Sequence, residues 1–411
     1  MNAALAPAAP SDLSISAKDM TASNLSPEAV HRSALVIDTH ADTPQRLLDD
    51  HYDLAQPLGG GNFNIETARA GSLVAEFFSI WVEPALHQGK YTHRTLELID
   101  AVKRQVALHP DALALATSPD DIERVHHDRR LAILLGIEGG HSIENSLGLL
   151  RQYYALGVRY MTLTWNNSNG WADSSGDVDD PAVPHTGDGL SAFGVEVIQE
   201  MNRLGMMVDI SHVSQKTLLR TLAVSRAPVL ASHSSARALC DVPRNLTDDE
   251  LRAVANSGRP GSNGGVVQVN FYSGFLSPEY RTALETLRPK LDREIAACRD
   301  RAKAEGRVLH GGELEAIRKA AADQLPRPPL SMLVDHIDRI ARVAGIDHVG
   351  LGSDFDGVAG QLPEGMNSPA DLPKITAALM ERGYSPGDCH KILGKNLMRL
   401  FREVQAAAER A

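Results

Sequence analysis

Histidine and carboxylate side chains follow apolar runs of the sequence at several separate places. The segments are VIDTHADTP with His40 and Asp42, GIEGGH with Glu138, VDISHVS with His212, ASHSSA with His233, and GLGSDFDG with Asp354. Imidazole and carboxylate groups suit zinc and related divalent ions. Three histidines and two acids are more ligands than one tetrahedral zinc needs, which favours two metal ions that share a carboxylate. Such pairs lie roughly 3.5–4 Å apart and can hold a bridging hydroxide.

A single histidine is weak evidence for a metal site. The chain has 16 histidines, and any one of them is more often a surface residue or a satisfied core residue than a ligand. Aspartate after a strand is also an ordinary helix N-cap. The recurrence of these residue types after successive apolar runs favours the metal site over both alternatives.

Short apolar runs alternate with amphipathic stretches along the chain. The runs are residues 34–38, 73–82, 131–139, 159–165, 206–211, 228–233, 264–272 and 348–355. Most are rich in Val, Ile and Leu throughout, which is typical of parallel strands that are buried on both faces. This repeated strand–helix alternation predicts an α/β fold of the (β/α)8 TIM-barrel type, with an open doubly wound sheet as the alternative.

A barrel would bring the candidate ligands together. The carboxyl ends of all strands in a parallel barrel lie on one face, and that face carries the active site. Side chains two positions apart on a strand point to the same side, so we expect His40 and Asp42 to face the barrel axis and Ala41 to face away from it.

The remaining segments predict the domain organisation. Residues 1–25 are rich in Ala, Pro and Ser and predict a flexible N-terminal arm, whereas residues 26–405 are predicted to form a single catalytic domain. Residues 277–325 are charged and helical, with opposite charges at i, i+4 spacings. They predict a helical insertion between strands seven and eight, which would be a solvated excursion, a lid or a dimer contact. The glycine-rich residues 58–63 predict a flexible loop.

The composition argues against several functions. The 411 residues carry a formal net charge of −11 and no basic stripe, which disfavours nucleic acid as a partner. The 3 cysteines lie far apart and form no CxxC motif, which disfavours a disulfide framework and a cysteine zinc site. No apolar run has membrane-spanning length and the N-terminus lacks a signal-peptide pattern, which predicts a cytoplasmic protein. A leader already removed would instead indicate a periplasmic or secreted protein.

The sequence resembles the membrane (renal) dipeptidases and, behind them, the metal-dependent amidohydrolase barrels. The similar stretches lie between residues 30 and 403 and include VIDTHADTP, GIEGGHSIENSLGLLRQYYALGVRYMTLT, VDISHVS, ASHSSARAL, PRNL, VNFY and GLGSDFDG. The resemblance implies a dipeptidase with two Zn²⁺ per chain, a small peptide as substrate and a homodimer. The apolar C-terminal tail of the lipid-anchored animal enzymes has no counterpart, so we expect no membrane anchor.

The resemblance also implies a role for each residue of the site. His40 and Asp42 would bind one metal ion, His212 and His233 would bind the second, and Glu138 would bridge the two. The remaining roles would be those of acid/base residue for Asp354, of substrate-carboxylate ligand for Arg244 in PRNL, and of pocket wall for Tyr272.

One position departs from the family pattern. The animal enzymes have a histidine after TLT that helps to bind the substrate, whereas this sequence has Trp165. Tryptophan can neither ligate a metal nor accept a proton. Either a neighbour such as Asn166 supplies the polar contact to the substrate, or the range of substrates differs.

The expected reaction is hydrolysis of a dipeptide by a metal-bridging hydroxide, with Asp354 passing the proton to the leaving amine. The resemblance implies that a D-residue at the C-terminal position is accepted. The alternatives are another amidohydrolase activity, on acyl-amino acids, lactones or cyclic amides, and a metal- or ligand-binding barrel without catalysis.

Overall fold

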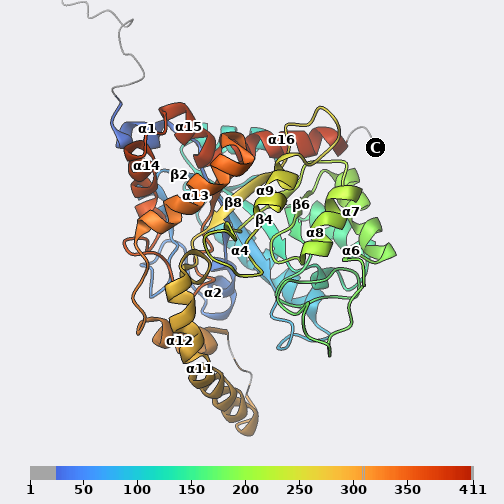
Figure 1. Cartoon of the computed structure of the whole chain (residues 1–411). Helices are drawn as coiled ribbons and strands as arrows, with labels where there is room; N and C mark the ends of the chain where they lie inside the picture. Colours follow the sequence, from blue (N-terminus) through green and yellow to red (C-terminus); the bar gives the residue numbers. More distant parts are fainter. Residues whose placement is uncertain (1–24, 308, 310, 409–411) are drawn as a thin grey trace, which may run out of the picture.

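The computed structural model describes residues 25–307, 309 and 311–408, and its strands form one parallel sheet that curls into a barrel (Figure 1). The predicted N-terminal arm therefore lies almost entirely outside the described residues. The strands are β1 (Val36–Ala41), β2 (Leu73–Trp81), β3 (Leu113–Leu115), β4 (Leu131–Glu138), β5 (Val158–Thr162), β6 (Met207–Asp209), β7 (Leu230–Ala231), β8 (Val266–Asn270) and β9 (Val349–Gly352). Every predicted apolar run overlaps a strand. Only the short β3, which pairs with β4, was absent from the sequence prediction.

The barrel is nearly closed. Its strands follow the order β1-β2-β4-β5-β6-β7-β8-β9, so neighbours in the sheet are also neighbours along the chain. The first and last strands meet where Ala41 and Phe355 form a parallel bridge and the Asp42 N–H donates to the Phe355 carbonyl at 2.8 Å. The predicted (β/α)8 barrel is confirmed, and the open doubly wound sheet, which would leave two free edges, is wrong.

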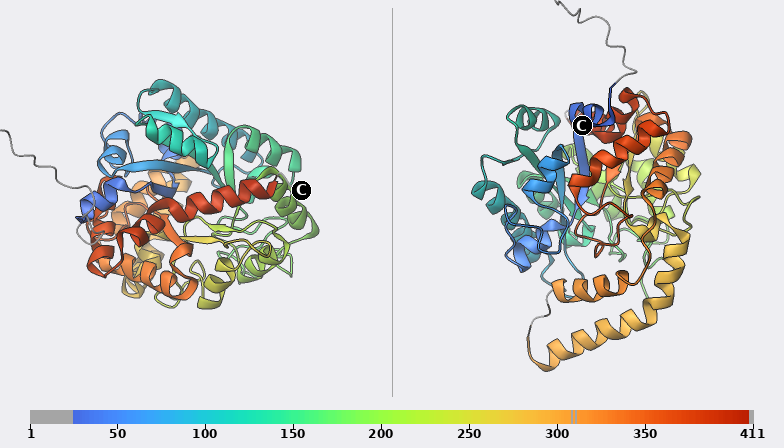
Figure 2. Two further views of the ribbon diagram at one scale, coloured as in Figure 1. Left: turned by 90° about the horizontal axis from the view of Figure 1, so that it is seen from above. Right: turned by 90° about the vertical axis from the view of Figure 1, so that its left-hand side faces the viewer.

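Helices surround the barrel (Figures 1 and 2). They are α1 (Pro27–Ser33), α2 (Thr43–Asp49), α3 (Ile65–Ala70), α4 (Tyr91–Leu108), α5 (Pro119–His127), α6 (Leu147–Ala155), α7 (Ala192–Leu204), α8 (Gln215–Val224), α9 (Asp248–Ala255), α10 (Ser273–Leu276), α11 (Pro278–Ala304), α12 (Gly311–Ala322), α13 (Leu330–Ala344), α14 (Leu372–Glu381), α15 (Pro386–His390) and α16 (Asn396–Ala408). Hydroxyl caps help to start several of them, as where Ser214 accepts from the Thr217 N–H at the start of α8. None of the described helices combines the length and apolar composition that crossing a membrane requires.

Helix α16 covers one end of the barrel, as the view from above in Figure 2 shows. Its Leu397, Leu400 and Phe401 are buried in one apolar cluster with Phe77 of β2 and Tyr160 of β5. The barrel interior is therefore packed with apolar side chains at this end. The ring of Tyr160 lies in this cluster, and its hydroxyl reaches His40 of β1.

The predicted insertion between the seventh and eighth barrel strands is present. Helices α11 and α12 connect β8 to α13 and project from the body of the barrel (Figures 1 and 2). The expected i, i+4 ion pairs occur on α11, where Arg281 Nε lies 2.7 Å from Glu285 Oε1. Helix α12 also contacts α2, which follows β1, so the insertion lies beside the carboxyl ends of the strands.

The glycine-rich residues 58–63 form a loop, and hydrogen bonds hold both of its ends. The Asp356 carboxylate accepts from the Asn62 N–H at 2.6 Å and from the Thr43 hydroxyl at 2.8 Å. Arg46 Nη2 donates to the Leu58 carbonyl at 2.5 Å. These bonds tie the loop to the chain that follows β1 and to the chain that follows β9.

Candidate metal centre and active site

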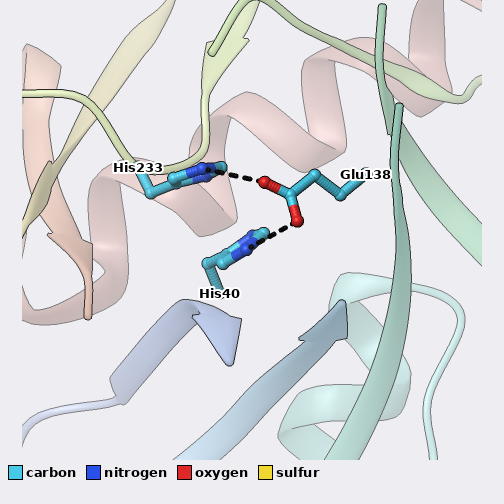
Figure 3. Close-up of side chains that lie close together, drawn as sticks. All are labelled: His40, Glu138 and His233. Carbon is cyan, nitrogen blue, oxygen red and sulfur yellow. Dashed lines mark ion pairs between the residues drawn. The ribbon is translucent and has the colours of Figure 1, made fainter. Parts of the chain in front are cut away.

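Glu138, at the end of β4, lies at the centre of the candidate ligands. Its Oε1 is 2.8 Å from His212 Nε2. The same oxygen is 3.4 Å from His233 Nε2, and its Oε2 is 3.6 Å from His40 Nε2 (Figure 3). Asp42 Oδ2 lies 3.6 Å from the same nitrogen of His40. All five side chains are buried. The structure therefore brings together the residues that the sequence predicts as metal ligands.

Tyr160 fixes the tautomer of His40. The Tyr160 hydroxyl donates its single proton to the Thr39 carbonyl at 3.0 Å, and the same oxygen lies 3.0 Å from His40 Nδ1. The hydroxyl must therefore accept from an Nδ1–H of His40. The lone pair of His40 is then on Nε2, which faces Glu138 and has no hydrogen-bond partner among the described residues.

The same reasoning applies to the other two histidines. The Ser232 hydroxyl donates to Asp209 Oδ2 at 2.6 Å, so it accepts from His233 Nδ1 at 2.7 Å. The amide oxygen of Asn166 accepts from His212 Nδ1 at 2.9 Å. Both rings therefore present an Nε2 lone pair to Glu138. Such partners orient histidine ligands in metal sites.

This donor set fits a divalent cation. The Nε2 atoms of His212 and His233 lie only 2.9 Å apart, and two lone pairs at that distance repel unless a positive charge lies between or beside them. Two groups have their ligand atoms within 4.8 Å of one another: His40 with Glu138 and His233, and His40 with Asp42 and Asp354. Neutral imidazoles and carboxylates of this kind match the chemistry of zinc.

The pKa shifts indicate a buried excess of negative charge. Burial, together with the nearby charge of Glu138, raises the pKa of Asp42 to about 7. Burial also acts to raise the pKa of Glu138, but His40, His212 and His233 hold it well below its usual value. Burial acts to lower the pKa of His40, yet Tyr160 and Glu138 raise it. A field that favours a proton on His40 also favours a metal cation there.

The backbone around the site has unusual conformations. His212 and Asp354 are non-glycine residues with φ of 66° and 64°, in the left-handed region that costs energy for such side chains. Asp42 occupies the N-cap position of α2, but its side chain makes no capping hydrogen bond. The N-cap alternative for Asp42 therefore does not explain why this carboxylate points into the site.

Asp354 lies beside the metal ligands and is held by a residue that the sequence analysis did not single out. The Asn270 amide donates to Asp354 Oδ2 at 2.9 Å from the end of β8. Burial raises the pKa of Asp354, and the charge of Glu138 adds to this effect, while His40 and the Asn270 bond oppose it. Asp354 is thus a carboxyl group with one oxygen fixed and a raised pKa, at the mouth of the barrel.

Arg244 is a buried cation without an anionic partner among the described ion pairs. It is 8% exposed, and burial lowers its pKa to about 10, so it remains charged at neutral pH. It donates to the Ser234 hydroxyl at 3.3 Å and to the His233 carbonyl at 3.1 Å, and its Nε has no partner among the described residues. A cavity of about 140 Å³, which His212 also lines, lies beside it.

Aromatic side chains lie on two sides of the site. The guanidinium of Arg244 is 5.2 Å from the ring centre of Phe275, and the Tyr272 ring packs edge-on against Phe275 at 4.7 Å. On the other side, the Trp165 ring lies 4.9 Å from Trp81 and 6.5 Å from His212. Among the residues predicted to contact substrate, Asn166 is exposed at its residue level but hydrogen-bonds His212.

A (β/α)8 barrel whose strand ends converge on three imidazoles and three carboxylates defines a metal-dependent hydrolase. The sequence model described as membrane dipeptidase, peptidase family M19, matches residues 26–411. The chain belongs to that family, and it is a metal-dependent dipeptidase by that membership, as the resemblance in the sequence predicts.

Individual relatives agree with this assignment. The chain is 35% identical over 398 residues to an uncharacterized dipeptidase of Schizosaccharomyces pombe, covering 92% of this chain and 82% of that protein. It is 32% identical over 388 residues to dipeptidase 3 of Mus musculus, covering 93% and 67% respectively. Both alignments span most of this chain.

Solved structures have the same fold. The probable dipeptidase PvdM from Pseudomonas aeruginosa aligns with a TM-score of 0.78 and 28% identity, covering 93% of this chain and 98% of that one. A metallo peptidase from Rhodobacter sphaeroides, liganded with a phosphinate mimic of the dipeptide L-Ala-D-Ala, aligns with a TM-score of 0.70 and 23% identity, covering 90% and 99%. The second likeness supports the fold alone.

Proposed function

We propose that the chain is a binuclear zinc dipeptidase that accepts a D-residue at the C-terminal position. The observation that supports two metal ions is that the two carboxylate oxygens of Glu138 face different histidines. Its Oε1 faces His212 and His233, whereas its Oε2 faces His40. One carboxylate with its two oxygens turned toward different histidines is suited to bridge two ions. His40 and Asp42 would hold one ion, and His212 and His233 the other.

The bound ions would supply Lewis acidity, which lowers the pKa of water and polarises the scissile carbonyl. Asp354 would accept the proton of the attacking water and deliver it to the leaving amine. The upward shift of its pKa suits both steps, because it moves the group from the usual carboxyl range toward neutrality. The Asn270 bond to Oδ2 would leave the other oxygen of Asp354 for the proton.

Arg244 would select short peptides with a free C-terminal carboxylate. A buried guanidinium without an anionic partner among the described residues is costly, and a substrate carboxylate would satisfy it with charge-assisted hydrogen bonds. Tyr272 would line the same side of the pocket, where both it and Arg244 contact Phe275. A longer peptide would place no carboxylate at this point.

The test is hydrolysis of a dipeptide panel that contains L-Ala-L-Ala and L-Ala-D-Ala, by zinc-loaded protein with and without a chelator. We expect chelator-sensitive cleavage of both dipeptides and about two zinc ions per chain. One zinc ion at full activity would contradict the binuclear assignment. Cleavage of the L,L substrate alone would contradict the stereochemical assignment.

Trp165 favours a second candidate function, which is another amidohydrolase activity. It is the residue that departs from the family pattern, and its ring lies beside the ligand His212. If the protein holds its metal but cleaves no dipeptide, the panel is extended to acyl-amino acids, lactones and cyclic amides. Metal binding without any hydrolysis would favour the non-catalytic barrel.

Other expectations from the sequence remain proposals. We infer that residues 26–405 act as one catalytic unit, that the protein works in the cytoplasm and that it forms a homodimer. The continuous barrel between α1 and α16 supports the first inference. Light scattering of the purified protein would give the mass in solution, and the mass of one chain would contradict the dimer.

A further inference from the structure

Two partly exposed tryptophans lie side by side at the edge of the metal centre. Trp81 is the last residue of β2 and pairs in the parallel ladder with Glu138 of β4. Trp165 follows β5, and the two ring centres are 4.9 Å apart at an interplanar angle of 56°. We call Trp81 and Trp165 the tryptophan wall. It places aromatic surface beside the metal ligand His212, on the side of the site away from Phe275 and Tyr272.

The tryptophan wall is anchored through its backbone. The Trp81 carbonyl accepts from the Gln45 side chain at 2.7 Å, and the next carbonyl, that of Val82, accepts from His141 Nε2 at 2.8 Å. The Trp165 carbonyl accepts from the Ser174 hydroxyl at 2.5 Å. A surface held in this way is formed before a substrate arrives, which favours selective binding.

Arg244 and the tryptophan wall come from different sides of the barrel mouth, because Arg244 follows β7, whereas Trp81 ends β2, which lies across the barrel from β7 in the strand order. Arg244 bonds to the His233 carbonyl, the His233 ring centre lies 4.9 Å from that of His212, and the His212 ring is 6.5 Å from Trp165. A dipeptide with its carboxylate at Arg244 and its scissile carbonyl beside Glu138 would thus extend its N-terminal residue toward the wall. This step rests on the proposed function, because it takes its direction from the carboxylate at Arg244.

We propose that the tryptophan wall determines specificity for the N-terminal side chain, and that it favours dipeptides with an aromatic or large apolar N-terminal residue. Burial of apolar surface against two indole rings is favourable, and aromatic rings gain further from stacked or edge-on contacts. A small side chain leaves the wall in contact with water. A charged side chain loses hydration and finds no charged partner on either indole ring.

The experiment compares kcat/KM for two matched series on the zinc-loaded enzyme. One series varies the N-terminal residue, with L-Phe-L-Ala, L-Leu-L-Ala, L-Asp-L-Ala and L-Ala-L-Ala. The other varies the C-terminal residue, with L-Ala-L-Phe and L-Ala-L-Leu. We expect the wild type to prefer L-Phe-L-Ala over L-Ala-L-Ala by about tenfold or more. Trp165→Ala and Trp81→Ala should each abolish most of that preference and leave the ratio within the C-terminal series unchanged.

Phe275→Leu is the matched control, because Phe275 is an aromatic residue on the Arg244 side of the site. It should change the C-terminal series and leave the N-terminal ratio unchanged. If an alanine variant of the tryptophan wall fails to fold, Trp165→Phe, which keeps an aromatic ring, should show an intermediate loss of the preference. Metal content is measured for every variant, so that a loss of zinc is not mistaken for a change in specificity.

The outcomes separate this inference from the proposed function. Dipeptide cleavage by the wild type without a preference for the N-terminal residue would contradict the proposed role of the tryptophan wall. It would leave the proposed dipeptidase function standing. Equal losses in both series would also contradict the role of the wall, because they would indicate general damage to the site. Absence of any dipeptide cleavage would overturn the proposed function and this inference together.

Discussion

Asp42 and Asp354 approach each other across Gly357. A β-carbon built on Gly357 would lie 2.2 Å from Oδ2 of Asp42 and 2.3 Å from Oδ1 of Asp354. Two carboxylates that converge on one point of the backbone require a residue without a side chain there. Both belong with His40 to one of the groups that could hold a cation.

The close approach predicts that Gly357→Ala damages the site far more than the fold. The added methyl group would push the two carboxylates apart, so we expect a loss of metal and of at least about tenfold in kcat/KM. The measurements are zinc content and dipeptide turnover. Gly387→Ala is the control, since its β-carbon would meet nothing closer than Ser385 Oγ at 3.6 Å. Equal behaviour of the two variants would argue against the carboxylate pair.

Tyr160→Phe tests the orientation of His40. Without the hydroxyl, His40 Nδ1–H loses its acceptor and its ring is free to turn, so we expect metal affinity or activity to fall about 10- to 100-fold. Tyr153→Phe is the matched control, because Tyr153 is equally buried and its hydroxyl donates to the Ser142 carbonyl at 2.9 Å. The control should lose stability but keep its zinc affinity. A Tyr160→Phe enzyme with wild-type affinity would contradict the positioning role.

His336 on α13 predicts a loss of stability in acid that is independent of the metal site. It is buried, its Nδ1 accepts from the Ala236 N–H at 3.0 Å and its Nε2 donates to the Leu276 carbonyl at 3.1 Å. Burial lowers its pKa from 6.5 to about 4 in the folded protein. The unfolded chain therefore binds more protons between these values, and the stabilisation is complete above 6.5 and is lost as the pH falls through 4.

The expected size follows from the pKa difference. Between pH 7.5 and pH 5, the free energy of unfolding should fall by about 2 kcal/mol more in the wild type than in His336→Asn, which does not titrate. Urea unfolding at the two pH values, with chelator present in both proteins, measures this. Equal losses in wild type and variant would show that His336 does not carry the effect.

The sequence predicted the barrel and the meeting of the ligands because both follow from local patterns. Buried parallel strands are continuous in apolar residues, and their carboxyl ends must share one face. His40, Glu138 and His233 therefore had to lie near one another, although they come from strands far apart in the chain. The two-residue spacing of His40 and Asp42 was likewise sufficient to place both in the site.

The residues that orient the ligands could not be predicted in the same way. Tyr160 bonds to His40 across 120 positions of the sequence, and which interior side chains meet depends on the relative register of the strands. Asp209 and Ser232 carried a weak signal, as polar residues at the ends of otherwise apolar strands. The hydrogen bond between Asp356 and residues 58–63 could not be predicted either. A glycine-rich composition indicates conformational freedom but does not indicate which contacts the loop makes.

Asp354→Asn should separate metal binding from proton transfer. The amide keeps the shape of the side chain and the neighbourhood of Asn270, but it cannot accept the proton, so we expect kcat to fall at least about 100-fold with zinc retained. Asp356→Asn is the control two residues on, in the same left-handed backbone conformation with φ of 63°. It should lower stability through the loop at residues 58–63 and spare most of kcat. Near wild-type turnover by Asp354→Asn would remove it from the acid/base role.

Arg244→Met should remove recognition of the substrate carboxylate. Loss of a charge-assisted contact predicts a rise in KM of about 10- to 100-fold for a dipeptide, with a smaller change in kcat. A dipeptide amide, which lacks that carboxylate, should be a poor substrate for the wild type and should be treated alike by wild type and variant. Arg237→Met is the control, because Arg237 lines the same cavity but is already paired with Asp241 at 2.7 Å. If Arg244→Met still discriminates the dipeptide from its amide, the substrate carboxylate binds elsewhere. The proposed orientation of the substrate across the metal centre would then be wrong.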